Sequence, residues 1–331
     1  MKLLLTGGTG FIGSRLALEA RRQQLDVIVA GQLNTDAERT RLAELETAGV
    51  TVAQGPLQDA DFARRVATGC QVVIHLAAAQ HEANVPDSYF RDVNVTGTRT
   101  LLEASRAAGV RRFVYGSTIG VYGSAGDGTL DESTPPSPVN IYGQTKLEAE
   151  EVVKSFSDSL AVSIVRISET YGPGDFRLLK LFRAVDRKRF FMIGNGLNRR
   201  QVIHVNDLVR GLLLAGEHPA AVGQTFVMAG HQVMTTQQMV EGIAQGLGLQ
   251  RPRLRVPLWP FLTAAVIFET TLKPLGIQPP LHRRRLDFFR KSFVFSTDKA
   301  QRLLGFRPTI NFRDGAAETA QWYRSRGFLG P

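Results

Sequence analysis

Two side chains four residues apart, Tyr142 and Lys146, have the types and the spacing needed to move a proton. Residues at this spacing share one face of a helix, so the pattern predicts that the phenol and the ammonium are neighbours. An ammonium lowers the pKa of a nearby phenol, because the opposite charge favours the phenolate. A tyrosine whose pKa falls from about 10 toward neutrality can give or take a hydroxyl proton. The pair is therefore a candidate acid/base centre that gives or takes a hydroxyl proton.

A glycine-rich turn near the start of the chain is a second candidate. Gly7, Gly10 and Gly13 follow an apolar run at 2–5 and precede a segment, 11–22, with apolar residues at helical spacing. In this setting, glycines allow a tight bend, close approach of the backbone to a pyrophosphate, and close packing of helix on strand. The helix N-terminus offers free N–H groups and a positive dipole end to phosphate. The turn therefore predicts a dinucleotide-binding site.

Alternating strands and helices must position these residues. Strands are expected at 2–5, 26–30, 50–53, 72–76, 112–115 and 161–165, with helices between them, notably at 11–22, 98–108 and 143–156. Such alternation indicates βαβ units and a parallel sheet. Glycine and proline become frequent after residue 172. The predicted fold class is α/β: a Rossmann-type doubly wound parallel sheet over residues 1–171, and a smaller C-terminal α/β region at 172–331 that mainly binds substrate.

Further short motifs follow the glycine turn in order along the chain. They are His75-Leu76-Ala77-Ala78, Asn94 with Gly97-Thr98, Ser117-Thr118 with Val121-Tyr122-Gly123, Tyr142 with Lys146, Arg166 with Tyr171-Gly172-Pro173-Gly174, and Arg200 with His204-Val205-Asn206-Asp207. Together with the turn, they resemble the extended short-chain dehydrogenase/reductase family, also called the NAD-dependent epimerase/dehydratase family. The resemblance covers nearly the whole chain. Its C-terminal part, at 279–300, is similar to the 3β-hydroxysteroid dehydrogenase-like branch.

The resemblance implies an NAD(P)-dependent oxidoreductase or epimerase. The resemblance further implies that Tyr142 is the general acid/base and that Thr118 hydrogen-bonds the reacting oxygen. Lys146, besides lowering the pKa of Tyr142, would bind the nicotinamide ribose. No metal is expected. The expected cofactor contacts are Gly7, Gly10, Phe11, Ile12, Gly13, Gln32, Leu57, Leu76, Ala77, Ala78, Asn94, Ser117, Tyr142 and Lys146. The expected substrate contacts are His81, Thr118, Glu169, Arg200 and Arg283.

The adenosine end of the site departs from the family pattern. Gly31, followed by Gln32, stands where NAD users usually carry an acidic residue that binds the ribose hydroxyls. Without that carboxylate a 2′-phosphate is not repelled, and Arg39 or Arg41 can pair with one. Pro56 stands where the family typically has Asp beside the adenine. The cofactor is therefore expected to be NADP or NAD, with NADP preferred.

The substrate end departs as well. Glu169 stands where nucleotide-sugar enzymes commonly have an Asn that touches the sugar diphosphate, and a carboxylate there repels phosphate. Arg200 is retained where those enzymes hold the diphosphate, a group that guanidinium suits well. The 4,6-dehydratases of the family carry an acidic pair after the catalytic threonine. Ile119 and Gly120 occupy those positions, which argues against a sugar 4,6-dehydratase.

Three functions compete. The first is an epimerase or reductase of a nucleotide sugar, which Arg200 and the basic C-terminal half favour. The second is a 3β-hydroxysteroid dehydrogenase-like enzyme for an apolar sterol or lipid, which Glu169 and the apolar segment 257–268 favour. We place the first slightly ahead. The third is a catalytically silent dinucleotide-binding subunit, and the intact Thr118, Tyr142 and Lys146 argue against it.

Composition and charge bear on partners and location. The single cysteine, Cys70, excludes an internal disulfide and fits a reducing compartment. We find neither a secretory signal nor an apolar run of about 18 residues, so a cytoplasmic protein is expected. The net charge of +10 comes without a nucleic-acid motif, so the expected partner is a small molecule. The apolar segment 259–268 is interpreted first as a buried helix, and second as a contact with a membrane surface or a lipid. The family resemblance implies a homodimer.

Overall fold

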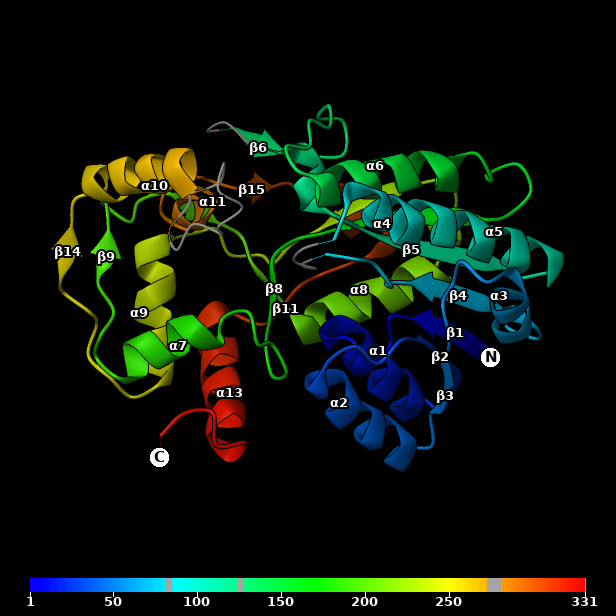
Figure 1. Ribbon diagram of the computed structural model, residues 1–331. Helices are drawn as coiled ribbons and strands as arrows, with labels where there is room; N and C mark the ends of the chain where they lie inside the picture. Colours follow the sequence, from blue (N-terminus) through cyan, green and yellow to red (C-terminus); the bar gives the residue numbers. More distant parts are fainter. Residues whose placement is uncertain (81–84, 124–127, 273–280, 282, 331) are drawn as a thin grey trace.

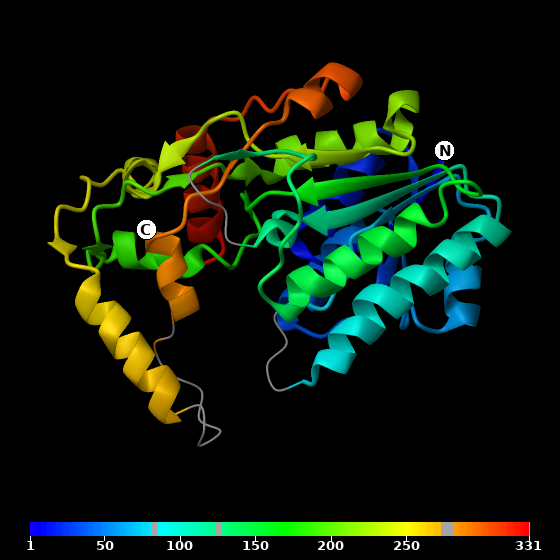
Figure 2. The ribbon, with the colours of Figure 1, turned by 90° about the horizontal axis from the view of Figure 1, so that it is seen from above.

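A parallel sheet of seven strands forms the centre of the protein, in the order β12-β7-β5-β4-β1-β2-β3. Figures 1 and 2 show the computed structural model, which describes residues 1–80, 85–123, 128–272, 281 and 283–330. The strands are β1 (Lys2–Thr6), β2 (Asp26–Gly31), β3 (Thr51–Gln54), β4 (Val72–His75), β5 (Arg112–Thr118), β7 (Val162–Ile167) and β12 (Thr225–Met228). The predicted α/β class and doubly wound parallel sheet are confirmed.

The direction in which successive strands are added reverses between β1 and β4. From β1 the chain builds outward through β2 and β3, and from β4 it builds the other way through β5, β7 and β12. In such sheets ligands bind outside the carboxyl ends of the strands, at the point of reversal. Thr6 at the end of β1 pairs with His75 at the end of β4. The glycine turn and the segment after β4 therefore start side by side at this point.

Helices cover both faces of the sheet. One face is packed by α1 (Phe11–Arg22), α2 (Asp36–Thr47), α8 (Val205–Glu217) and α12 (Asp298–Leu304), and the other by α3 (Ala60–Ala67), α5 (Gly97–Ala107) and α6 (Ile141–Lys154). Leu3, Leu4 and Leu5 of β1 are therefore all buried, although their side chains alternate between the two faces. Burial on both sides explains why the central strands are continuous apolar runs.

The C-terminal part forms a smaller unit beside the sheet, at the left of Figure 1. Its core joins Phe182, Met239, Ile243, Ala316 and Tyr323. Its helices are α7 (Leu179–Asp186), α9 (Thr236–Gly246), α10 (Trp259–Leu272), α11 (Arg283–Leu286) and α13 (Phe312–Ser325). The described residues also form four two-residue strand pairs: β8 (Thr170–Tyr171) with β11 (Ile203–His204), β9 (Met192–Ile193) with β14 (Arg255–Val256), β10 (Arg199–Arg200) with β13 (Met234–Thr235), and β6 (Thr129–Leu130) with β15 (Val294–Phe295).

The two parts interleave along the chain. The predicted division at residue 172 remains a prediction, but α8 and β12 lie beyond it and belong to the sheet layers. β12 pairs in parallel with β7, which completes that edge of the sheet. The chain therefore crosses between the two parts several times.

Helix α10 covers the segment that we expected to be a buried helix. Helix formation is confirmed, but burial is wrong: Ala265 is buried, whereas Trp259 is 69% exposed and Ile267 is 52% exposed. The inner side packs through Phe261 and Ala265 onto the C-terminal part. The helix lies at the periphery in both ribbon views, so its other side is uncovered by the described residues. No helix among those described is long and apolar enough to cross a membrane.

Candidate active site

The turn between β1 and α1 is a cradle that side chains would fill. Gly7 has φ of +67°, and a Cβ there would lie 2.7 Å from the backbone nitrogen of Ala77. A Cβ on Gly13 would lie 2.2 Å from the carbonyl oxygen of Gly7. Glycine is therefore required by both the backbone angle and the close approach. Gly10 caps α1 without a side-chain hydrogen bond, which leaves the helix N-terminus suited to phosphate.

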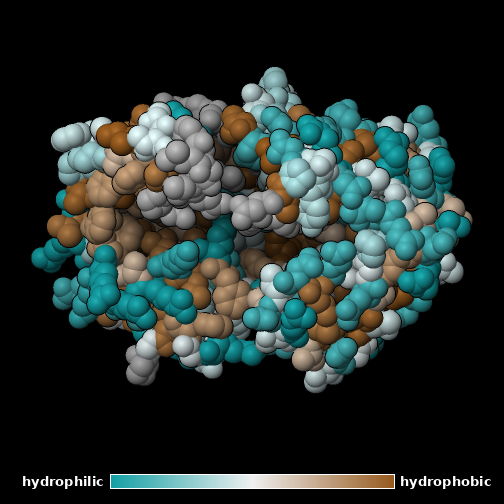
Figure 3. All heavy atoms as spheres, in the orientation of Figure 1, coloured by the Kyte–Doolittle hydropathy of each residue, from teal (hydrophilic) through white to brown (hydrophobic). Residues whose placement is uncertain are grey.

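One pocket of about 560 Å³ runs along the carboxyl edge of the sheet, a size typical of small-molecule sites. Figure 3 shows the molecule hollowed between its two parts. Following the strand order, the pocket passes from the loops after β3 and β2, over the glycine turn, to the ends of β5 and β7. Every expected cofactor residue except one lines it: Gly7, Gly10, Phe11, Ile12, Gly13, Gln32, Leu57, Leu76, Ala77, Ala78, Ser117, Tyr142 and Lys146.

The start of α6 and the end of β5 bring the three predicted catalytic residues to this pocket. Asn140 caps the helix by accepting a hydrogen bond from the backbone N–H of Gly143 at 2.9 Å. Gly143 packs so tightly that a Cβ there would lie 2.7 Å from the carbonyl oxygen of Gly120. The helix therefore starts directly against the turn that follows Thr118. Thr118 Oγ1 accepts from the N–H of Gly120 at 3.0 Å, and a hydroxyl also carries one donor. Thr118, Tyr142 and Lys146 all line the pocket.

Lys146 is a buried cation. Its side chain is 1% exposed, and Nζ lies 4.1 Å from the centre of the Tyr115 ring. Burial lowers the pKa of Lys146 to about 7, while the carboxylate of Glu150 acts in the opposite direction. The surroundings of Lys146 thus place its pKa near neutral pH, where the side chain changes between its charged and neutral forms.

A buried polar cluster supports the helix behind the predicted catalytic residues. Glu150 accepts hydrogen bonds from Ser117 Oγ at 2.5 Å and from Arg166 Nη2 at 2.8 Å. Arg166 Nη1 also donates to Tyr122 Oη at 2.9 Å. Ser117 lines the pocket as predicted, but its hydroxyl already donates to Glu150. These bonds fix α6 against β5 and β7.

Asn94 is the exception among the predicted cofactor contacts. It lies in a π-helical turn, η1 (Asp92–Thr96), is buried, and does not line the pocket. Its Oδ1 accepts from the N–H of Ala79 at 2.7 Å, and its Nδ2 donates to the carbonyl of Ala79 and to Thr145 Oγ1. Its amide is consumed by these bonds, so Asn94 positions the loop after β4 against α6 instead of touching the cofactor.

The adenosine end does not offer the arginines that we expected to bind a 2′-phosphate. Arg41 donates to the carbonyl of Gly174 at 2.8 Å and lies over the Phe176 ring, while Arg39 pairs with Asp36 at the surface. The described pocket-lining residues that follow β2 and β3 include no Arg or Lys. They are Gly31, Gln32, Asn34, Glu38, Gly55, Pro56, Leu57 and Gln58. Gly31 thus lacks the acidic side chain that NAD users carry, and the described lining residues at this end provide no Arg or Lys for a 2′-phosphate.

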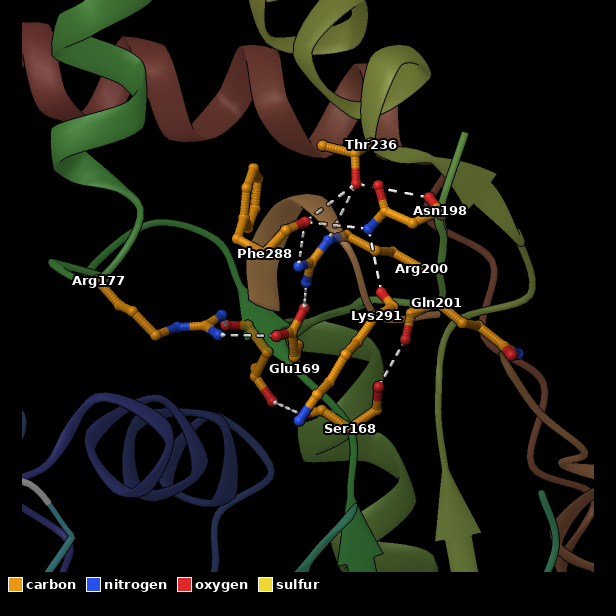
Figure 4. A network of polar contacts seen from close by, with 10 residues as sticks. Ser168, Glu169, Arg177, Asn198, Arg200, Gln201, Thr236, Phe288 and Lys291 are labelled. Atoms are coloured by element: carbon orange, nitrogen blue, oxygen red, sulfur yellow. Dashed lines mark hydrogen bonds and ion pairs between the residues drawn. The ribbon is translucent and has the colours of Figure 1, made fainter. Parts of the chain in front are cut away.

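The substrate end differs from expectation in two arginines. Arg200 is 4% exposed and lies behind the pocket wall, where Nη1 donates to Glu169 Oε2 at 2.6 Å (Figure 4). Arg283 is exposed and pairs with Glu269 at 2.8 Å, away from the pocket lining. Neither arginine lines the pocket, and each guanidinium is engaged by a carboxylate of this chain, so their substrate contacts stay predictions. His81 lies outside the described residues.

Glu169 does line the pocket as predicted. Although burial opposes ionisation of its carboxyl, Arg200 and Arg177 hold the pKa of Glu169 below its usual range. Glu169 therefore presents a negative charge at the substrate end near neutral pH.

Sequence reasoning missed several lining residues, above all Asp175 and Arg177. They follow the Gly172-Pro173-Gly174 turn, which leads the chain back along the pocket. Asn34, Glu38, Tyr89 and Val93 also line it. A turn directly after β8 was a usable signal for the first two, whereas the others lie in segments without a distinctive pattern.

Comparisons with known proteins agree with this geometry. A model of the NAD dependent epimerase/dehydratase family matches residues 3–229. A dTDP-glucose 4,6-dehydratase of Streptomyces niveus is 29% identical, over 98% of this chain and 93% of the relative. A 3beta-hydroxysteroid-dehydrogenase/decarboxylase of Arabidopsis thaliana is 28% identical, over 96% of this chain and 78% of the relative. The crystal structure of DesIV, a dTDP-glucose 4,6-dehydratase from Streptomyces venezuelae with NAD bound, superposes with a TM-score of 0.79 at 28% identity, covering 100% of this chain and 99% of that one.

Proposed function

Because the chain belongs to the NAD-dependent epimerase/dehydratase family of extended short-chain dehydrogenase/reductase enzymes, we propose that it transfers a hydride between a nicotinamide dinucleotide and a secondary alcohol or ketone. One observation carries the proposal. The glycine cradle and the predicted catalytic residues Thr118, Tyr142 and Lys146 line a single pocket at the point where the strand order reverses.

The residues present fit a dinucleotide. The cradle at Gly7 and Gly13 admits a group only because no Cβ fills it, and the N-terminus of α1 would hold the pyrophosphate. Lys146 would hold the nicotinamide ribose. When bound, the dinucleotide supplies the hydride or accepts it.

The chain's own residues handle the proton. Tyr142 gives its phenolic proton to a ketone oxygen, or takes the proton of an alcohol, as general acid or base. The ammonium of Lys146 favours the phenolate because opposite charges attract. Thr118 donates its hydroxyl hydrogen to the reacting oxygen while its Oγ1 accepts from Gly120. This assignment rests on the common pocket and on the helix spacing of Tyr142 and Lys146.

The decisive test replaces Tyr142 by Phe. Turnover should fall by about 100-fold or more, the range of general acid–base contributions, while NADH affinity stays near that of the wild type. Tyr89→Phe is the matched control, because Tyr89 lines the same pocket without a lysine at helical spacing. Full activity of Tyr142→Phe contradicts the acid/base role. Tight cofactor binding by a wild-type protein that turns over no alcohol or ketone would favour the silent subunit.

For the cofactor we propose NAD, in place of the NADP preference expected from Gly31. Arg41 is engaged away from the adenosine end, and DesIV binds NAD. NADH should therefore quench protein fluorescence at lower concentration than NADPH. A Cβ on Gly31 meets nothing closer than 3.8 Å, so Gly31→Asp is sterically tolerated and should weaken NADPH further. Tighter binding of NADPH than of NADH by the wild type contradicts the proposal.

A nucleotide sugar is the substrate class favoured by the relatives, which include dTDP-glucose 4,6-dehydratases. Ile119, which lines the pocket after Thr118, supplies no acid for a dehydration, so epimerisation or reduction is the reaction of this candidate. The second class is a sterol-like or lipid alcohol, supported by the Arabidopsis relative and by the engaged Arg200. Thermal shift with dTDP-glucose and with a 3β-hydroxysteroid separates the two, because a ligand stabilises the protein according to its concentration relative to Kd.

Two contacts with larger partners are also proposed. α5 and α6 lie side by side on one face of the sheet in both ribbon views, and we propose that they form the interface of a homodimer. Light scattering after size-exclusion chromatography tests this. Arg253, Leu254 and Arg255, which precede α10 in the chain, are also exposed, and we propose that the exposed side of α10 rests on an anionic lipid surface.

A further inference from the structure

The wall of the pocket beyond the reacting residues presents a carboxylate. Glu169 follows β7, and 33% of its side chain is exposed. Its Oε2 accepts from Arg200 Nη1 at 2.6 Å, while Oε1 lies 3.8 Å from Arg177 Nη1. Figure 4 shows the carboxylate between the two guanidiniums. Because the pair with Arg177 is long, Oε1 is open to a hydrogen-bond donor on a substrate.

Arg200 is held from several sides and cannot turn toward the pocket without losing its hydrogen bonds and its contact with the Phe288 ring. Its Nη2 donates to the carbonyl of Phe288 at 2.8 Å, and its Nε donates to Thr236 Oγ1 at 3.3 Å. The guanidinium carbon lies 4.1 Å from the centre of the Phe288 ring. Turning it to a substrate would break these contacts and leave Glu169 without its partner. Separating a buried ion pair is strongly unfavourable.

The other charged residues of this wall are Arg177 and Asp175. Arg177 is 43% exposed, and its Nη2 donates to the carbonyl of Thr170 at 2.8 Å. Asp175 lines the same pocket. Burial raises the pKa of Asp175, so Glu169 is the carboxylate of this wall whose charge is held by its partners; of those partners Arg177 lines the pocket, whereas Arg200 is behind the wall. A diphosphate would bring at least two negative charges beside Glu169, and like charges repel, while Arg177, the only guanidinium among the described pocket-lining residues, already neighbours that carboxylate.

We infer that Glu169 determines specificity: it excludes substrates that carry a diphosphate and selects a neutral alcohol or ketone with a hydroxyl that donates to its carboxylate. The inference rests on the proposed function, since it concerns the substrate end of the same pocket. Of the two proposed substrate classes, it therefore selects the sterol-like or lipid alcohol, which carries no phosphate.

The test is calorimetric titration of UDP into protein saturated with NADH, without turnover. The wild type should bind UDP at least about tenfold more weakly than Glu169→Gln, in which the neutral amide leaves the charge of Arg200 uncompensated. Glu169→Asp keeps the charge and should still exclude UDP. Glu241→Gln is the control for net charge, because it removes a carboxylate that pairs with Arg251 on the surface, and it should behave as the wild type.

Equal affinity of the wild type and Glu169→Gln for UDP overturns the inference, and so does tight UDP binding by Glu169→Asp. If Glu169→Gln does not fold, the wild type still decides, because a Kd for UDP below about 0.1 mM contradicts exclusion. NADH titration of the same samples reports on the proposed function separately. A wild type that binds no NADH contradicts that function, whereas NADH binding together with tight UDP binding contradicts only the role of Glu169.

Discussion

Arg166 on β7 and Glu150 on α6 form a buried bidentate ion pair, with Nε···Oε1 and Nη2···Oε2 distances of 3.1 and 2.8 Å. Glu150 lies one helical turn beyond Lys146, whose pKa its carboxylate raises against the effect of burial. The pair therefore both anchors the catalytic helix and supports the charge of the lysine.

Glu150→Gln should shift the alkaline limb of the pH–rate profile to lower pH. Without the carboxylate, burial lowers the pKa of Lys146 below about 7, so its ammonium is lost earlier as the pH rises. The variant should also be less stable by a few kcal/mol, because breaking a buried pair typically costs about 3–5 kcal/mol. Glu148→Gln, on the exposed part of the same helix, is the control. If the alkaline limb does not move, the pKa of Lys146 does not depend on Glu150.

Lys146→Met should be inactive but gain stability at neutral pH. The folded pKa of about 7 lies below the ordinary 10.5, so between these values the unfolded chain binds more protons and the wild type becomes more stable as pH rises. Below pH 7 the penalty is present in full, on the order of a few kcal/mol. The difference in Tm between variant and wild type should shrink from pH 7 to pH 10. Lys154→Met, exposed at the end of the helix, should show no such trend.

Gly13→Ala should abolish dinucleotide binding. The added methyl carbon would meet the carbonyl oxygen of Gly7 at 2.2 Å and Cα of Gly8 at 2.6 Å, so backbone atoms would have to move. Gly97→Ala is the matched control, since its nearest neighbour, Leu57 Cβ, lies at 3.7 Å. NADH fluorescence titration measures both. Wild-type affinity in Gly13→Ala contradicts the placement of the pyrophosphate at this turn.

Asn94→Ala should weaken NADH binding without removing a direct contact. Without the amide of Asn94, the loop at Ala79 is no longer connected to Thr145, and buried polar groups are left unpaired. This should lower the free energy of unfolding by about 1–3 kcal/mol. We expect a lower Tm and a higher Kd for NADH. Asn195→Ala removes a comparable local bond in an exposed turn and should change neither. A lower Tm with unchanged NADH affinity would restrict Asn94 to a structural role.

Trp259→Ser should reduce co-sedimentation with vesicles that contain phosphatidylserine. Trp259 is 69% exposed on the uncovered side of α10, and an aromatic ring contributes much of the binding of such helices to lipid. Neutral vesicles should bind less than anionic ones, because the arginines that precede α10 add charge attraction. Thr263→Ser, on the same helix, is the control. Equal sedimentation of wild type and Trp259→Ser contradicts the lipid contact.

The fold was predictable from sequence because its signals are local. Apolar runs, helical spacing and the glycine turn specify the elements and their order, and chain order largely specifies a parallel sheet. Tyr142 with Lys146 was recognisable for the same reason, since four residues along a helix set their relation. The partner of Arg41 was beyond such reasoning, because Gly174 lies 133 residues away.

The sequence alone therefore determined the α/β fold, and it placed the glycine turn and the predicted acid/base pair Tyr142 and Lys146 on elements that the structure brings to one pocket. Tertiary structure decided which polar side chains are available to a ligand. Arg200 and Glu169 are 31 residues apart, and they meet because β11, which follows Arg200, pairs with β8, which follows Glu169. A guanidinium can bind a substrate or a carboxylate of its own chain, and the residue type is the same in both cases. Burial and partner, which arise only when distant segments pack together, settle that choice.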